Sequence, residues 1–342
     1  MRKCALSALP AILSRLAESR AVYLPADGDD GCARFTRYAE GMAMSNALLT
    51  VRSAKDLFFP QTEDMVGFRM EGKQIEILDI RKETEDFVVF GMRACDVRSL
   101  AILDRVFLSE PVDSFYAARR AHGVVVSMAC DRPAETCFCH TFGIDPAAPQ
   151  GDVVCVKTAD GYYFTAHSDK GAALLGVVAD LTEEADPAAV ESEQAAIRQR
   201  MEKLPLHTLT ADAFGSGKTA TFFDAPAWDT LSAACLGCGT CTFVCPTCQC
   251  YDIRDFDTGH GIRRFRCWDS CMYSDFTQMS AGQPRLTQSA RFRQRFMHKL
   301  VYFPENNDGM FGCVGCGRCL KSCPISMNIV KVMKTLGGNA HE

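Results

Sequence analysis

The chain of 342 residues is 47% hydrophobic and 23% charged, with a formal net charge of -5. This length allows about two domains of ordinary size, and the mild net acidity argues against nucleic acid as a principal partner. No apolar run approaches the roughly 20 residues that a helix needs to cross a bilayer, so we predict no membrane insertion.

The first 20 residues, MRKCALSALPAILSRLAESR, combine a basic start with a short apolar run. Arg15 and Arg20 interrupt that run at helical spacing, and no small-residue cleavage site follows. This pattern favours an amphipathic first helix over a secretory signal peptide, and therefore a cytoplasmic protein.

Strand-like and helix-like segments then alternate. Residues 74–80 and 86–91 are rich in β-branched and aromatic residues, residues 96–107 have helical periodicity, and residues 122–130 are typical of a buried strand. This order indicates a βαβ unit in a parallel or mixed sheet. A further strand is expected within residues 160–168, then a short helix and a polar surface helix before residue 205.

Two nucleotide-binding patterns are missing. The stretch FGSGKTATFF resembles a phosphate-binding loop, but Asp212 stands where that motif requires its first glycine. No GxGxxG follows a strand anywhere in the sequence. We therefore predict that this chain binds neither flavin nor NAD itself.

Nineteen cysteines are the outlier of the composition; seven precede residue 235 and twelve follow residue 234. A secreted disulfide framework would be small and would carry an export signal. Thiols in a reducing cytosol indicate metal or redox chemistry instead. The uneven distribution predicts two domains, an α/β domain over residues 1–225 and a cysteine-rich domain over residues 226–342.

The cysteine-rich part contains two blocks with the spacing C-x2-C-x2-C-x3-C-P. They are Cys235, Cys238, Cys241 and Cys245, and then Cys313, Cys316, Cys319 and Cys323. Three closely spaced thiolates can hold one corner of a [4Fe–4S] cluster, the glycines between them allow tight turns, and the fourth cysteine ligates the other cluster.

The blocks therefore predict two [4Fe–4S] clusters with crossed ligation. Cys235, Cys238, Cys241 and Cys323 would hold the first, and Cys313, Cys316, Cys319 and Cys245 the second. Zinc knuckles use paired C-x2-C and leave the third cysteine and the cysteine–proline pair unexplained. Clusters held entirely by cysteine transfer electrons rather than transform substrates.

The 66 residues between the blocks contain few strand-like runs and several helix-like ones, notably residues 289–303. The long insert disfavours a compact two-cluster ferredoxin. We therefore predict an α+β, multidomain chain in which a mainly helical ferredoxin domain follows the α/β domain. The insert also holds nine Arg or Lys against four Asp between residues 254 and 299, interpreted as a solvated face that offsets cluster charge, or as a docking face.

Eight further cysteines are weaker candidates. If the strands at 86–91 and 122–130 are parallel neighbours, the cysteines that follow them meet at one sheet edge, where α/β folds place ligands. A third cluster or plain packing would explain this first group, which is Cys95, Cys130, Cys137 and Cys139. Another centre, or packing near the first cluster, would explain the second group, which is Cys248, Cys250, Cys267 and Cys271.

The chain resembles an iron–sulfur subunit family that is shared by anaerobic sulfite reductases and by sulfhydrogenase-type nickel–iron hydrogenases, in which it is the β subunit. The resemblance runs over nearly the whole chain. It is carried by FPQTE, GMRACDVRSLAILDRVF, CDRPAETCFC, CLGCGTCTFVCPTCQC, RCWDSC, RFRQRFMHK and GCVGCGRCLKSCP.

This resemblance implies an electron-transfer subunit of a cytoplasmic anaerobic complex, without catalytic activity of its own. Its partners would be a flavin-containing subunit that handles NAD(P)H and a catalytic subunit. The first expectation for the latter is a sulfite reductase, followed by a hydrogenase or a heterodisulfide-reductase-like module. The alternative is a catalytic subunit whose N-terminal cysteine site transforms a substrate. A redox-sensing regulator would need a nucleic-acid-binding or signalling module, and the sequence indicates none.

Overall fold

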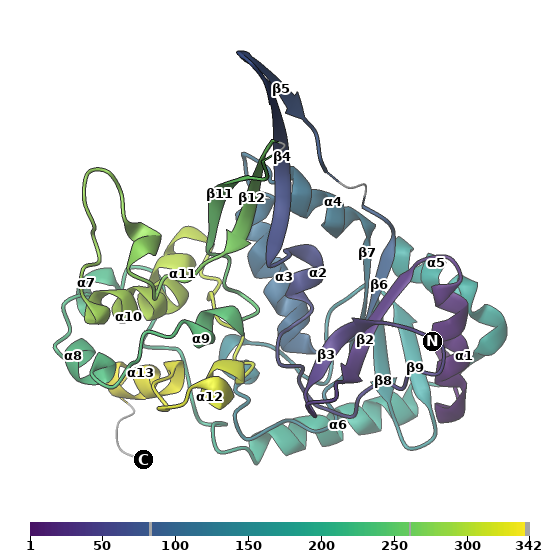
Figure 1. The fold of residues 1–342 in the computed structure, drawn as a ribbon. Helices are drawn as coiled ribbons and strands as arrows, with labels where there is room; N and C mark the ends of the chain where they lie inside the picture. The colour runs from purple at the N-terminus through teal and green to yellow at the C-terminus, as the bar shows by residue number, and fades with distance from the viewer. Residues whose placement is uncertain (82–83, 260, 339–342) are drawn as a thin grey trace.

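An eight-stranded mixed sheet forms the centre of the N-terminal part in the computed structural model, which describes residues 1–81, 84–259 and 261–338 (Figure 1). The strand order is β10 (Glu183–Glu184), β1 (Arg2–Cys4), β9 (Tyr162–Ala166), β8 (Val153–Lys157), β7 (Gly123–Met128), β6 (Phe87–Met92), β2 (Ala21–Asp27) and β3 (Ala33–Arg37). Strands β2, β6, β7 and β8 are mutually parallel, and the strands on either side are antiparallel. The expected α/β sheet is therefore present.

Helices cover both faces of this sheet, which is why every residue of β6 and β7 is buried. Val88 and Phe90 face one core with α1 (Leu9–Ala17) and α5 (Asp169–Val177). On the other face Phe87 packs with α2 (Lys55–Phe58), α3 (Ala94–Phe107) and α4 (Ser114–His122). Helix α6 (Ala188–Glu202) covers β8. The period of two in β6 thus assigns alternate side chains to two separate cores.

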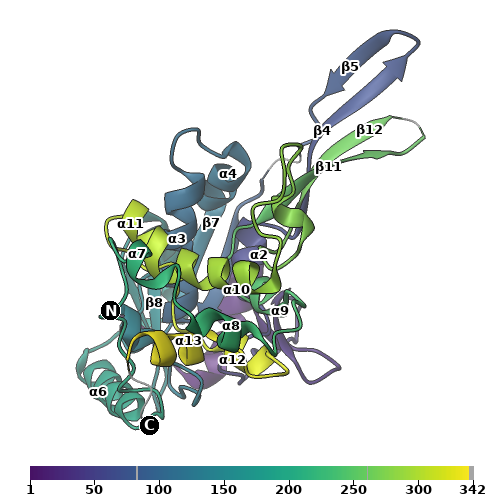
Figure 2. The same ribbon diagram turned by 90° about the vertical axis from the view of Figure 1, so that its left-hand side faces the viewer.

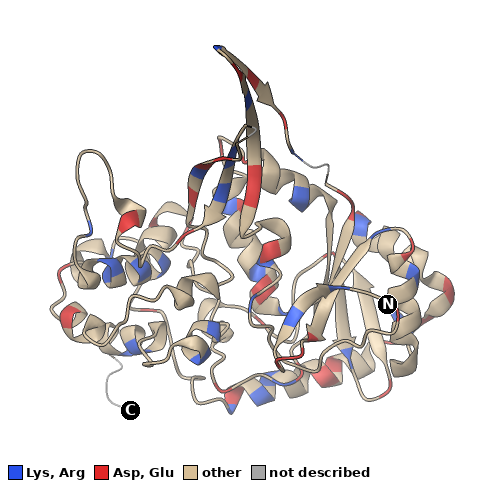
Figure 3. Cartoon of the chain, in the orientation of Figure 1, with Lys and Arg blue, Asp and Glu red and all other residues tan. Residues whose placement is uncertain are grey.

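A second, four-stranded sheet joins the two ends of the chain. Its order is β11 (Tyr251–Asp257), β12 (Ile262–Trp268), β4 (Thr62–Glu71) and β5 (Gln74–Leu78), all antiparallel. It extends away from the rest of the molecule (Figure 2), and basic and acidic residues are mixed along its strands (Figure 3). Its first two strands lie within the insert between the cysteine blocks.

The prediction of few strands in that insert is therefore wrong. Strand β11 is exposed along almost its whole length, and β12 is exposed at Arg263 and Arg264 and half-buried or buried elsewhere. Neither strand shows the hydrophobic alternation that would mark a half-buried strand. Strand β12 pairs with β11 on one side and, on the other, with β4, which lies about 200 residues earlier in the chain. Sequence pattern alone gives no sign of such a long-range partner.

One buried ion-pair network ties this sheet to the α/β part. Arg266 of β12 is 2% exposed. Its guanidinium donates to Glu63 of β4, with Nε to Oε2 at 2.7 Å, and to the carboxylate of Asp113, the residue that caps α4. Glu63 also pairs with Arg119. The network therefore holds β12, β4 and α4 in one arrangement.

Short helices make up the rest of the C-terminal part. They are α7 (Thr219–Phe222), α8 (Ala227–Ser232), α9 (Thr240–Phe243), α10 (Gln288–Met297), α11 (Phe303–Asn306), α12 (Arg318–Ser322) and α13 (Ile329–Leu336). A π-helical turn, His298–Tyr302, joins α10 to α11. Their shared core includes Phe214 and Phe222 from before residue 226. No helix in the described ranges is long and apolar enough to span a membrane.

Replacing Arg266 tests the link between the two sheets. We expect Arg266→Met to lower the free energy of unfolding by about 3–5 kcal/mol, because it leaves the buried carboxylates of Glu63 and Asp113 without their shared cation. Arg264→Met is the matched control, since Arg264 lies on the same strand and pairs with Asp255 in solvent. Urea denaturation measures both, and equal stability of the two variants would contradict the assignment.

Candidate metal centres

The first cysteine block encloses a small cavity. Cys235 and Cys238 line it from the loop that leads into α9, Cys241 from the first turn of α9, and Cys323 from the end of α12. The fourth cysteine of the second block thus lies with the first three of the first block. This is the arrangement that crossed ligation requires. We call it site 1.

Site 1 reaches the molecular surface. Cys238 is exposed, and its hydrogen bond with the Thr240 hydroxyl, at 3.4 Å, lowers the pKa of the thiol. Tyr273 donates to the Cys238 carbonyl and Gln288 Nε2 donates to Cys235 Sγ, at 3.2 Å and 3.4 Å. These side chains fix the loop while leaving one of its thiols accessible from solvent.

The second block forms site 2, which is buried more deeply. Burial, aided by the charges of Cys319 and Cys245, raises the pKa of Cys313 to about 12. Burial also raises the pKa of Cys316, and the charges of Cys245 and Cys319 raise it further. Cys245 therefore lies near Cys313, Cys316 and Cys319, and ligation of one cluster by these four thiols stays a prediction. Cys319 of site 2 is close enough to Cys241 of site 1 to raise its pKa, so the two sites are neighbours.

A third group of thiols lies at the sheet edge. Cys95 begins α3 directly after β6, and Cys130 follows β7, the parallel neighbour of β6. Besides burial, the charges of Cys137 and Cys139 raise the pKa of Cys130, and the charge of Cys139 raises the pKa of Cys95. All four side chains are buried, and burial raises the pKa of Cys130 and Cys139 to about 12. We call this group site 3.

Sites 2 and 3 are in direct backbone contact. Gly315 and Gly317 have φ values of 59° and 77°, and a Cβ on either would lie 2.3–2.4 Å from the carbonyl oxygens of Phe138 and Thr136. Phe138 N donates to the Gly315 carbonyl at 2.9 Å. Glycine is needed at both positions for the left-handed conformation and for this close approach. Cys95 and Cys316 lie near each other across the same contact.

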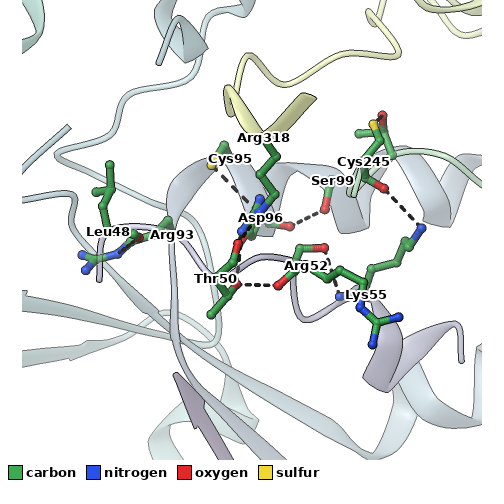
Figure 4. A network of polar contacts seen from close by, with 12 residues as sticks. Leu48, Thr50, Arg52, Lys55, Arg93, Cys95, Asp96, Ser99, Cys245 and Arg318 are labelled. Atoms are coloured by element: carbon green, nitrogen blue, oxygen red, sulfur yellow. Dashed lines mark hydrogen bonds and ion pairs between the residues drawn. The ribbon is translucent and has the colours of Figure 1, made fainter. Parts of the chain in front are cut away.

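A buried ion pair holds this contact in place (Figure 4). Arg318, in the second block, donates to both carboxylate oxygens of Asp96 at 2.5 and 2.7 Å, and Asp96 follows Cys95 in α3. The same guanidinium donates to the carbonyl and hydroxyl of Thr50. Both charged groups are less than 5% exposed. A bidentate pair of this kind fixes orientation as well as distance.

Three of the remaining candidate cysteines, Cys248, Cys250 and Cys271, lie beside another thiol, and the fourth, Cys267, does not. Cys248 shares a hydrogen bond with Cys245 that lowers the pKa of Cys245 well below its ordinary value, and one from Cys271 lowers the pKa of Cys250 to about 7. Cys267 lies apart on β12. Burial raises its pKa, and the charged groups that change it further are Arg254, Asp252 and Asp269 rather than thiols. Lys55 donates to the carbonyls of Cys245 and Cys248, which ties α2 to this segment.

The residues at sites 1 and 2 fit [4Fe–4S] clusters. Four thiols line the cavity of site 1, and positive-φ glycines precede both α9 and α12. Within the described part of the chain, no three His, Cys, Asp or Glu side chains converge as ligands of a single metal ion. Arg295 contributes a buried Nε without a hydrogen-bond partner. A cluster has sulfur atoms that can accept from such a donor.

The charged residues around these thiols were not recognised from the sequence. The sequence predicts a solvated face or a docking face for the basic insert, but three of its nine cations are buried, namely Arg266, Arg295 and Lys299. The last two are four residues apart on α10 and the following turn, a spacing that places them on one helix face. Arg318 carries a sequence signal of its own, as the one charged residue between the first and third cysteines of its block.

Comparison with known proteins supports the assignment of the C-terminal part. The family described as 4Fe-4S dicluster domain matches residues 234–327. Sulfhydrogenase 2 subunit beta of Pyrococcus furiosus is 35% identical over 256 residues, which cover 72% of this chain and 73% of the relative. No solved structure gives a significant match. The cysteine geometry and this similarity together show that the chain belongs to the iron–sulfur β subunit family that includes sulfhydrogenase 2 subunit beta.

Proposed function

We propose that this chain is the electron-transfer subunit of a cytoplasmic oxidoreductase complex. The observation that carries the proposal is the row formed by the three thiol sites. Site 1 is exposed at Cys238, site 2 adjoins site 1 through Cys241 and Cys319, and site 3 adjoins site 2 through Cys316 and Cys95. Clusters bound there would supply reversible one-electron chemistry.

The chain's own residues suit a relay in three ways. Cys238 offers an exposed end to a partner's cofactor. The Arg318–Asp96 pair and the glycine contacts hold sites 2 and 3 at a fixed separation. The thiols of site 3 are at most 7% exposed, so a substrate would have no open approach to them. This burial favours a relay over the alternative of a catalytic N-terminal site.

The partners follow from the family. We propose a flavin-containing NAD(P)H subunit on one side and a catalytic subunit on the other. A sulfite reductase and a hydrogenase are the two main candidates for the catalytic subunit, the second supported by the sulfhydrogenase relative, with a heterodisulfide-reductase-like module as a further candidate. Anaerobic affinity purification from the native organism, with identification of the co-purifying subunits, decides among them.

Iron content tests the number of clusters. We expect about twelve iron atoms per chain, four at each of three sites. The double variant Cys137→Ser/Cys139→Ser should lose about four of them, because both thiols belong to site 3. Cys267→Ser is the control and should lose none, since that thiol lies apart on β12. Eight iron atoms in the wild-type chain would contradict a third cluster.

Crossed ligation makes a separate prediction. Cys323→Ser should alter the same electron paramagnetic resonance signal as Cys235→Ser, because both thiols line the cavity of site 1. Cys245→Ser should alter the same signal as Cys313→Ser. If Cys245→Ser instead matched Cys235→Ser, each block would hold its own cluster and the crossed assignment would be wrong.

The relay itself is tested on the isolated chain. We expect reversible reduction of its clusters by a low-potential donor, followed by turnover only after the partner subunits are added. Reduction is followed by electron paramagnetic resonance, and turnover by consumption of sulfite or evolution of hydrogen. Substrate turnover by the chain alone would refute the proposal in favour of a catalytic subunit.

A further inference from the structure

Two buried cations of α10 and the turn after it lie beside sites 1 and 2, in addition to Lys55 of α2. Arg295 belongs to α10 and Lys299 to the π-helical turn that follows it, and their side chains are 3% and 5% exposed. Arginine and lysine are rarely buried to this extent unless an anion pairs with them.

No carboxylate serves this purpose within the described part of the chain. Lys299 Nζ donates to the Thr247 hydroxyl at 2.7 Å and to the Gly312 carbonyl at 3.0 Å, both neutral acceptors. Arg295 Nη2 makes a long contact with the Cys241 carbonyl at 3.5 Å, the Arg295 side chain also hydrogen-bonds to the Cys319 thiol, and its Nε has no partner. Neither side chain forms an ion pair with a described residue.

Other buried arginines of this chain are paired differently. Arg318 meets Asp96, and Arg266 meets Glu63 and Asp113. The fold therefore supplies carboxylates to both of these buried guanidinium groups, including that of Arg318 within the second cysteine block. Arg295 and Lys299 have no such carboxylate among the described residues, and neither does Lys55, which donates to the Cys245 carbonyl of site 2.

The thiols of both sites surround these cations. Burial opposes the charge of Arg295, yet Cys241 of site 1 and Cys319 of site 2 raise its pKa. Burial also opposes the charge of Lys299, whose pKa is raised by Cys245, Cys248 and Cys313. Arg295 thus lies between the two sites, and Lys299 lies against site 2.

We propose that Arg295 and Lys299 are the counter-charges of the clusters at sites 1 and 2 and raise their reduction potentials, with the larger effect at site 2. The inference rests on the proposed function, which places clusters at both sites. Reduction makes a cluster more negative, so a nearby fixed cation stabilises the reduced state more than the oxidised one. Site 2 has both cations beside it, and site 1 has Arg295 alone.

The charge at site 2 offsets the effect of its burial. A buried cluster resists the added electron because water no longer stabilises its charge. Without the two cations, site 2 would be harder to reduce than the more exposed site 1. With them, site 2 accepts an electron readily, and electrons can pass through the middle of the row.

Redox titration of the purified full chain, followed by electron paramagnetic resonance, tests the proposal. The site 2 signal is identified as the one altered in Cys313→Ser. We expect Lys299→Met to lower the reduced-to-oxidised ratio of site 2 at least tenfold at the wild-type midpoint, equivalent to 59 mV for one electron. Arg295→Met should lower the ratio at both sites, and Lys299→Arg should keep the wild-type values.

Arg293→Met is the matched control. Arg293 is on the same helix, but its guanidinium stacks on the Phe223 ring with 3.8 Å between its carbon and the ring centroid. The variant removes the same charge away from the sites and should leave both potentials unchanged. If Arg293→Met shifted them as much as Arg295→Met, net charge rather than position would explain the effect and the proposal would fail.

Loss of a cluster is also informative. If Lys299→Met loses the site 2 signal while Lys299→Arg keeps it, the cation is needed to hold the cluster, which supports the proposal. Loss in both variants would mean that the shape of lysine matters rather than its charge, and would count against the proposal.

Unchanged potentials with full iron content would overturn this inference but would not contradict the proposed electron relay. A wild-type chain without any cluster signal would overturn both.

Discussion

The contact between the second cysteine block and the Thr136–Cys139 segment decides how the two halves of this chain are placed. Gly315 and Gly317 bring backbone against backbone, at a separation that no side chain would permit. Arg318 reaches from the same block to Asp96 and fixes the orientation. Because Cys95 and Cys316 flank this contact, it brings together thiols that lie over 200 residues apart in the chain.

The chain joins its halves a second time through the four-stranded sheet. Strand β12 pairs with β4, and the buried Arg266 network fastens β12 to α4. Two connections, one beside the thiols and one in the protruding sheet, resist relative movement of the halves better than either alone. A row of redox sites benefits from such rigidity, because electron transfer depends on fixed separations between cofactors.

The buried cations around the thiols are of two kinds, those paired with a carboxylate and those that face only thiols and neutral groups. Arg318 is neutralised by Asp96, so the contact between sites 2 and 3 adds no net charge. Arg295 and Lys299 have neutral hydrogen-bond partners and face thiols. Burying an unpaired cation is costly in the absence of an anion. Negatively charged clusters at sites 1 and 2 would therefore offset the cost of burying Arg295 and Lys299.

Much of the local chemistry can be predicted from the amino-acid sequence. Regular cysteine spacing with interposed glycines predicted two cluster loops and their crossed partners, and β-rich runs before Cys95 and Cys130 predicted neighbouring parallel strands. These signals are local, since a loop around a cluster or a buried strand is encoded in fewer than about 15 consecutive residues. Tertiary structure alone decided the pairing of β12 with β4, the burial of Arg295 and Lys299, and the meeting of Arg318 with Asp96. Each depends on residues far apart in the chain, and an arginine has the same sequence signature whether it points into solvent or toward a buried thiol.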